Sequence, residues 1–147
     1  MLNLLAIPLI ILDSLNLSVP PLQRFIALVA YSLLSLMGVK IGIENYTLLL
    51  EKETVHISFD CTGWKSMYLL SSLIISTPLT NFRKKLRWLF MLLPILFLMN
   101  ILRILISVYI LSTQPQSFPF IHDFLWREGM VAFSIALWLL FLKKSIK

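Results

Sequence analysis

The sequence predicts an all-α polytopic membrane protein with four transmembrane helices. Of its 147 residues, 59% are hydrophobic and only 14% are charged, whereas about a quarter of the residues in a soluble domain are charged. The mean hydropathy is +0.87. The net charge of +6 comes from basic clusters at the ends of apolar blocks, which favours membrane topology over nucleic-acid binding. We expect a single membrane-embedded domain over residues 1–147.

The first transmembrane helix is expected over about residues 21–40. A span needs roughly 20 mostly apolar residues, and this stretch supplies them. Pro20 and Pro21 suit the first turn of a helix, because that turn leaves its N–H groups unpaired anyway. The preceding apolar block is too short to span and is interrupted by Pro8. Residues 1–19 are therefore expected to be interfacial or re-entrant, with a fifth span as the less favoured alternative.

A short extracytoplasmic β-hairpin is expected over residues 45–60, before the second span. Apolar and polar residues alternate from Thr54 to Phe59, which is the periodicity of a β-strand. The triplet "EKE" at residues 51–53 is a suitable turn between two short strands lying on the membrane surface.

Three further transmembrane helices are expected over about residues 62–80, 88–111 and 124–142. The basic cluster at residues 83–87 and the basic tail at residues 143–147 are expected in the cytoplasm, because cationic loops stay on that side. Both termini are then cytoplasmic, and the loops that carry most of the acidic residues face outward.

Cys61 is the only cysteine of the chain, which excludes an internal disulfide and a multi-cysteine metal site. It stands at the predicted N-terminus of the second span, on the outer face, where unpaired N–H groups and the helix dipole favour an anion. Lys65 adds a cation one turn on, so a nucleophilic thiolate is one interpretation. Asp60 opposes it unless its carboxylate turns away as an N-cap. A small apolar filler is the structural alternative.

Arg103 lies well inside the third span, about eight residues or 12 Å from its outer end. A guanidinium there costs at least about 2.5–3.5 kcal/mol on insertion scales, so it is expected to face protein or a wet cavity. Asn100 and Ser107 share its helical face. Snorkelling of Arg103 and an interhelical hydrogen bond from Asn100 are the structural alternatives.

His122 precedes the fourth span on the same expected outer face as Cys61. A histidine there is a natural acid–base partner for a thiolate, although a solvated surface histidine is the commoner role. His56 lies on the polar side of the predicted hairpin and is interpreted as structural or solvated. Two histidines in different segments and one cysteine do not form an obvious metal site, and we expect neither a metal nor a cofactor.

Together these residues resemble the exosortase/archaeosortase family of membrane-embedded cysteine transpeptidases. "CTGWKS" at residues 61–66, which includes Lys65, is similar to the family's C-[ST]-G motif with a basic residue and Ser soon after it. "NILR" at residues 100–103 matches N-x-x-R in the next span, and "HD" at residues 122–123 matches a His near the start of the following one. The resemblance covers roughly residues 45–142, the expected catalytic core. Many members carry several more spans before the Cys, so this chain resembles a minimal short form.

The resemblance implies a protease and transpeptidase of the cell membrane. Its expected substrate is an exported protein whose C-terminal tail has a short motif, a membrane helix and a basic cluster. The acceptor is expected to be a lipid or another envelope amine or hydroxyl. Cys61 would attack the scissile carbonyl, Arg103 would stabilise the oxyanion or hold substrate or thiolate, and His122 would protonate the leaving amine. Lys65 and Asn100 would support catalysis or bind substrate.

Two other classes of protein are compatible with the sequence. In a non-enzymatic polytopic scaffold, Arg103 would pair with a partner helix and Cys61 would be dispensable. In a small transporter or channel subunit, Asn100, Arg103 and Ser107 would line an anion path, although four short spans without evident repeats make this less attractive. Only the cysteine transpeptidase accounts for Cys61, Arg103 and His122 together.

Overall fold

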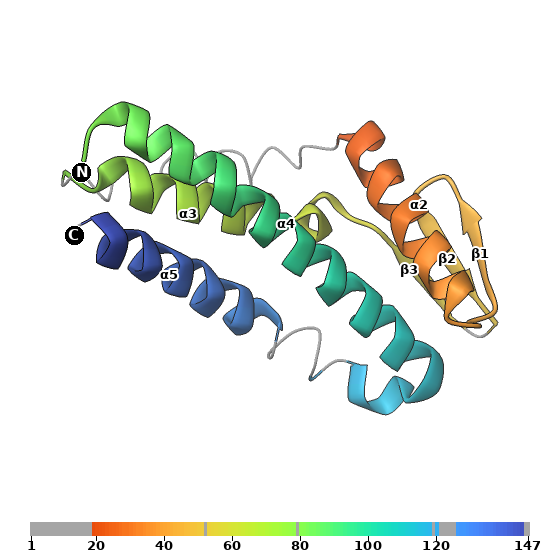
Figure 1. The fold of residues 1–147 in the computed structure, drawn as a ribbon. Helices are drawn as coiled ribbons and strands as arrows, with labels where there is room; N and C mark the ends of the chain where they lie inside the picture. Colours follow the sequence, from red (N-terminus) through yellow and green to blue (C-terminus); the bar gives the residue numbers. More distant parts are fainter. Residues whose placement is uncertain (1–18, 52, 79, 119, 121–125, 146–147) are drawn as a thin grey trace. The chain divides into compact units, whose positions relative to one another are not determined.

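The computed structural model describes residues 19–51, 53–78, 80–118, 120 and 126–145 of the chain. Helices make up most of the described residues, and a small sheet follows the first helix. In chain order the elements are α2 (Pro20–Leu36), β1 (Ile41–Glu44), β2 (Thr47–Leu50), β3 (Thr54–His56), the 3-10 turn η1 (Phe59–Thr62), α3 (Trp64–Ser76), α4 (Phe82–Thr113), the 3-10 turn η2 (Pro115–Ser117) and α5 (Trp126–Ser145) (Figure 1). The segment at residues 1–19 that is expected to be interfacial lies, except for Val19, outside the described residues.

The described residues form two compact units. The helical unit contains α3, α4 as far as Leu98, and α5 from Gly129 onward. The mixed unit contains α2, the sheet, η1 and the part of the chain from Met99 to Glu128. Helix α4 therefore contributes residues to both units, and the single domain expected over residues 1–147 stays a prediction.

In the mixed unit, α2 packs against the sheet through one apolar face. Pro20 and Pro21 occupy its first turn, as expected for residues that lack a backbone N–H. The apolar side chains that it buries recur at helical spacing and are Ile26, Ala27, Ala30 and Leu34. The helix is followed by Gly38, whose φ of 81° lies in the left-handed region that commonly ends a helix.

The sheet has three antiparallel strands in the order β1–β2–β3, one more than the two-stranded hairpin that the sequence predicts. β2 pairs with β3 across residues 51–53, with Leu48 opposite Val55. β1 pairs with the other edge of β2, with Ile43 opposite Leu48. Asn45, in the turn between them, has a φ of 55°, which asparagine tolerates better than most residues. The sequence does not predict β1, because its "IGIE" contains a glycine, which weakens the pattern of a strand.

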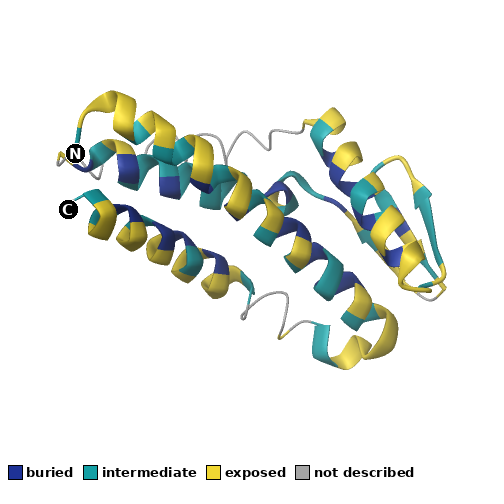
Figure 2. Ribbon diagram, viewed as in Figure 1, coloured by how far each residue is buried: buried dark blue, intermediate teal, exposed yellow. Residues whose placement is uncertain are grey.

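In the helical unit, aromatic side chains of α5 contact the first part of α4 and the end of α3. Trp88 of α4 meets Phe141 of α5 edge to face, with ring centroids 5.9 Å apart, and Phe141 is fully buried. The indole Nε1 of Trp138 donates a hydrogen bond to Thr77 Oγ1, just beyond α3, at 3.1 Å. The buried residues of α5 accordingly lie along the side of the helix that faces α3 and α4 (Figure 2).

Within the described residues, one helix, α4, is long and apolar enough to cross a membrane. Its 32 residues rise about 48 Å, and it begins at Phe82, just before the basic cluster, rather than near residue 88 as expected. Helix α3 has 13 residues and rises about 20 Å, less than the thickness of a hydrocarbon core. It ends early because Thr77 is extended, as residues before a proline tend to be. The count of four spans therefore stays a prediction.

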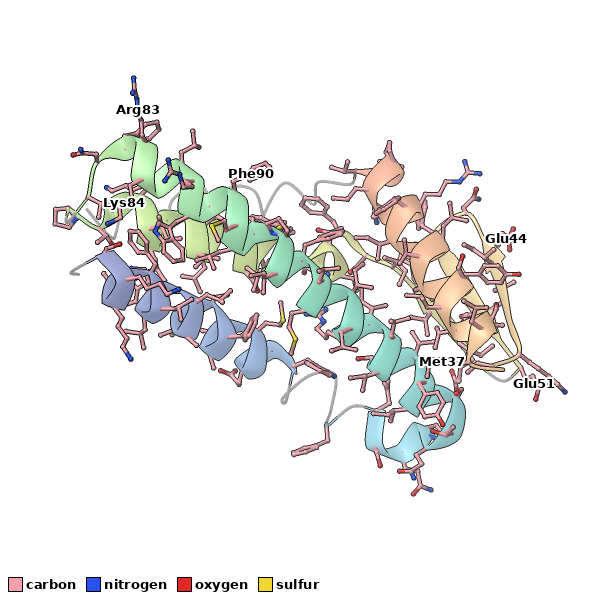
Figure 3. The ribbon with its side chains drawn as sticks, in the orientation of Figure 1. Met37, Glu44, Glu51, Arg83, Lys84 and Phe90 are labelled. Atoms are coloured by element: carbon pink, nitrogen blue, oxygen red, sulfur yellow. The ribbon has the colours of Figure 1, made fainter. Side chains whose placement is uncertain are left out.

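Helix α4 carries both exposed and buried side chains along its length. Its exposed large apolar side chains include Phe82, Leu86, Phe90, Ile95, Leu98 and Leu102. Phe90 points away from the helix (Figure 3). Its buried residues include Leu92, Leu96, Asn100, Ile104 and Val108. Exposed large apolar side chains that gather on a helix are typical of a surface that contacts lipid or another protein.

Candidate active site

Cys61 lies in η1, the 3-10 turn between β3 and α3. Its backbone N–H donates to the carbonyl oxygen of Ser58 at 3.0 Å, and Thr62 Oγ1 donates to another carbonyl of the same turn at 2.7 Å. Gly63 then adopts a φ of 76°, in the left-handed region that glycine enters without steric cost. The "CTG" sequence thus forms a closed turn, and α3 begins after it at Trp64.

The sequence predicts Cys61 at the N-terminus of a second span that begins at about residue 62, and in the structure Cys61 lies two residues before Gly63, the N-cap of α3. Helix α3 begins at Trp64, so Cys61 precedes its first turn. The stabilisation of an anion by a helix dipole falls off within that turn, and it is therefore not an argument for a thiolate here. The physical cause is Gly63, whose left-handed backbone separates η1 from α3.

The thiol of Cys61 has a polar neighbour that the sequence analysis did not single out. Ser58 Oγ lies 3.4 Å from Cys61 Sγ, and either atom can be the donor. The two residues are three apart, which is the spacing that brings side chains together in a 3-10 turn. The spacing of three residues is the only sequence signal for this contact. It was not used, because the 3-10 turn was not predicted. The Cys61 side chain is partly exposed.

Asn100 connects α4 to the turn that carries Cys61. Its Nδ2 donates a hydrogen bond to the backbone carbonyl oxygen of Cys61 at 2.8 Å, and the residue is 1% exposed. The bond joins residues 39 positions apart, so it fixes the turn against the helix. Asn100 therefore holds the backbone of Cys61 in place, which fits the supporting role expected for it.

Gln23 is a second buried support for this region, and the sequence analysis missed it. The residue is 3% exposed in α2, and its Nε2 donates to the carbonyl oxygen of Ile57 at 2.8 Å. Ile57 immediately precedes Ser58, the residue that contacts the Cys61 thiol. The sequence signal for this residue is an amide side chain on the apolar face of a helix. A buried amide needs hydrogen-bond partners, so this position predicts a contact with another part of the chain.

Cys61 and Arg103 line the same cavity of the mixed unit, which has a volume of about 420 Å³. The remaining walls come from β3 and the residues that flank it, from the following turns of α4 and from η2. His56 also contributes to the wall; its Nδ1 lies 3.3 Å from Thr47 Oγ1, and its ring packs edge to face on Tyr46. The residues that carry the thiol and the guanidinium therefore line one cavity.

Arg103 brings an unsatisfied donor to this cavity. Among the described residues, no group accepts a hydrogen bond from its buried Nε. The residue lies ten positions before Thr113, the last residue of α4, or about 15 Å along the helix axis. A buried N–H without an acceptor costs free energy, so the arrangement suits an oxygen acceptor supplied by a bound molecule.

The roles of the other two candidate residues, Lys65 and His122, stay predictions. Lys65 lies in the first turn of α3, in the helical unit, with its ammonium 5.9 Å from the ring centroid of Trp64. His122 lies outside the described residues. Within the described chain, the structure thus brings together Cys61, Asn100 and Arg103.

Replacing Asn100 with alanine is expected to loosen the Cys61 turn. The buried carbonyl of Cys61 would lose its donor, at a cost of about 1–3 kcal/mol in the free energy of unfolding. Thermal unfolding of the detergent-solubilised protein measures this loss. Asn100→Asp keeps the shape of the side chain but replaces the amide donor with a carboxylate, so it should be at least as destabilising. Wild-type melting temperatures for both variants would contradict the tethering role.

The chain was compared with known protein families, with curated proteins and with solved structures. A family model described as transmembrane exosortase matches residues 1–142, which is nearly the whole chain. No curated protein and no solved structure matches the chain.

Proposed function

Because this chain belongs to the transmembrane exosortase family, we propose that it is a membrane cysteine protease and transpeptidase. It cleaves the C-terminal sorting signal of exported proteins and transfers them to a lipid or another envelope acceptor. The observation that carries the proposal is the cavity of about 420 Å³ that both Cys61 and Arg103 line. Acyl transfer needs a nucleophile to attack the carbonyl carbon and a positive group to stabilise the oxyanion, and here residues with both groups line one cavity.

The first half of the reaction forms a thioester. The Cys61 thiolate attacks the scissile carbonyl carbon, so that an S–C bond forms and the carbonyl π electrons move to the oxygen. The Arg103 guanidinium stabilises this oxyanion in a site of low dielectric, where its charge counts for more than in water. The oxyanion then returns its electron pair, the C–N bond breaks, and His122 gives a proton to the leaving amine.

The second half transfers the acyl group. An amine or hydroxyl of the acceptor attacks the thioester carbon while His122 takes its proton, and the Cys61 thiolate leaves. The hydrogen bond of Asn100 to the Cys61 carbonyl keeps the sulfur in position through both halves. Exclusion of bulk water from the cavity favours transfer over hydrolysis.

Co-expression with a substrate tests the function. The substrate is an exported reporter protein that ends in a short sorting motif, a membrane helix and a basic cluster. We expect the wild-type chain to shorten the reporter at the motif and to leave an acceptor attached, and mass spectrometry of the new C-terminus measures both. A reporter that keeps its full tail, across reporters with different motifs from the same genome, would contradict the proposal.

The active site is proposed to face the extracytoplasmic side, with both termini in the cytoplasm. Because Cys61 is the only cysteine and is partly exposed, it is a built-in label for this question. A small membrane-impermeant maleimide is expected to modify the protein in intact cells, or in spheroplasts where an outer barrier is present. Labelling that occurs only after the membrane is permeabilised would place the thiol on the cytoplasmic side and contradict this orientation.

A further inference from the structure

Ser107 of α4 carries a buried hydroxyl that differs from several other helical hydroxyls of the chain. The residue is 4% exposed, and its Oγ has no hydrogen-bond partner among the described residues. Serine and threonine in helices commonly donate to the carbonyl four residues earlier. Among the described residues, the hydroxyls that make this bond include those of Ser32, Ser71, Thr77, Thr113 and Ser134. The hydroxyl of Ser107 does not make this bond.

The position of Ser107 on α4 places this residue next to Arg103 in the candidate site. Ser107 lines the same cavity as Cys61 and Arg103. It follows Arg103 by one helical turn, a spacing that puts the two Cβ atoms about 5–6 Å apart on one face of a helix. Arg103 Nε is also buried and without an acceptor in the described part of the chain. Two residues that line the cavity, one helical turn apart on α4, therefore each carry a buried donor, an O–H and an N–H, without a partner among the described residues.

We propose that Ser107 is a substrate-binding residue whose hydroxyl donates a hydrogen bond to the carbonyl oxygen of the acyl group that is transferred. This inference rests on the proposed function and adds a second donor beside Arg103. When the Cys61 sulfur bonds to the carbonyl carbon, the π electron pair moves to the oxygen, and the hydrogen bond from Ser107 strengthens with the negative charge. When the C–N bond breaks, the oxygen returns the pair and the bond weakens. The hydroxyl keeps its proton throughout.

The burial of Ser107 favours this role over a structural one. A hydroxyl that is buried without a partner destabilises the folded protein, so it contributes nothing to the fold in the absence of substrate. Residues of this kind are typical of functional sites, where stability is given up for a preorganised contact. An acceptor oxygen placed between Ser107 and Arg103 would satisfy both donors at once.

The Ser107→Ala variant tests the inference in the reporter-cleavage assay with the full chain. We expect kcat to fall about 100-fold, the effect typical of removing one oxyanion donor. KM should change little, because the bond is strongest in the transition state. The melting temperature should stay at the wild-type value or rise, because the variant removes an unsatisfied buried group.

Ser134→Ala is the matched control. Ser134 is fully buried in α5, and its Oγ donates to the carbonyl of Met130 at 2.8 Å, so its loss should leave kcat unchanged. Wild-type kcat for Ser107→Ala, or a loss of activity that only follows a lower melting temperature, would overturn the inference. Cys61→Ala separates this failure from that of the proposed function. If Cys61→Ala is inactive while Ser107→Ala is fully active, only the role of Ser107 is wrong; if Cys61→Ala still cleaves, the proposed function itself fails.

Discussion

Replacement of Cys61 by alanine will abolish tail cleavage. The variant lacks the sulfur that forms the thioester, and removal of the nucleophile from a covalent hydrolase lowers kcat on the order of 10⁶-fold, which is below detection in a co-expression assay. The fold should be retained, because the turn is closed by the backbone N–H of Cys61 and by Thr62, and Asn100 bonds the backbone carbonyl. Cleavage of the reporter tail and the melting temperature are the two measurements.

The covalent intermediate provides the control for this result. The wild-type chain should form a covalent adduct with the reporter. Hydroxylamine should release this adduct, as it does for thioesters. The Cys61→Ala variant should form no adduct. Undiminished processing by the alanine variant would leave a scaffold or a transport role as the remaining interpretation. Altered anion flux in Arg103 variants, together with a silent Cys61→Ala, would specifically favour the transport role.

Replacement of Arg103 by lysine is expected to lower kcat about 100- to 1,000-fold, the range for loss of a donor aimed at a developing oxyanion. Lysine keeps the positive charge but loses the planar fork and the Nε donor of arginine. That Nε is the atom that is buried without a partner among the described residues. The charge alone therefore should not restore the rate, and single-turnover formation of the thioester measures the effect at the step where the oxyanion appears.

Arg83→Lys is the comparison for this variant. Arg83 is an exposed residue of the first turn of α4, and its side chain extends away from the helix (Figure 3). The substitution keeps the charge of the basic cluster, so it should not change the rate. Near-wild-type activity of Arg103→Lys would show that Arg103 acts as a point charge, and it would exclude a role for the guanidinium geometry.

Several features of this protein follow from the sequence without a structure. The order of three motifs in the chain, at Cys61, at Asn100–Arg103 and at His122, predicts the family, and the match over residues 1–142 confirms it. The long apolar block before and after Arg103 predicts a membrane-crossing helix, and α4 is long and apolar enough to be one. The shared helical face of Asn100, Arg103 and Ser107 follows from their spacing, and in the structure Arg103 and Ser107 line one cavity.

Other features depend on local backbone geometry that the sequence pattern does not reveal. Cys61 lies in a 3-10 turn because Gly63 adopts a left-handed conformation, and a glycine in a sequence is compatible with both a turn and a helix start. The sheet gains a third strand because β1 pairs with β2. The four residues of β1 include a glycine, and such a short stretch does not predict this pairing by itself.

The sequence by itself determined which residue types are available: one thiol, one arginine deep in an apolar block, and an amide and a hydroxyl on the same helical face. Composition and periodicity suffice for this, because they reflect local preferences of the chain. Only the tertiary structure decided which atoms meet. The hydrogen bond of Asn100 to the Cys61 carbonyl, the contact of Ser58 with the thiol and the unsatisfied hydroxyl of Ser107 depend on the packing of η1, β3 and α4. Hydrogen bonds form or fail over a few tenths of an ångström, a distance that packing sets and that sequence spacing does not.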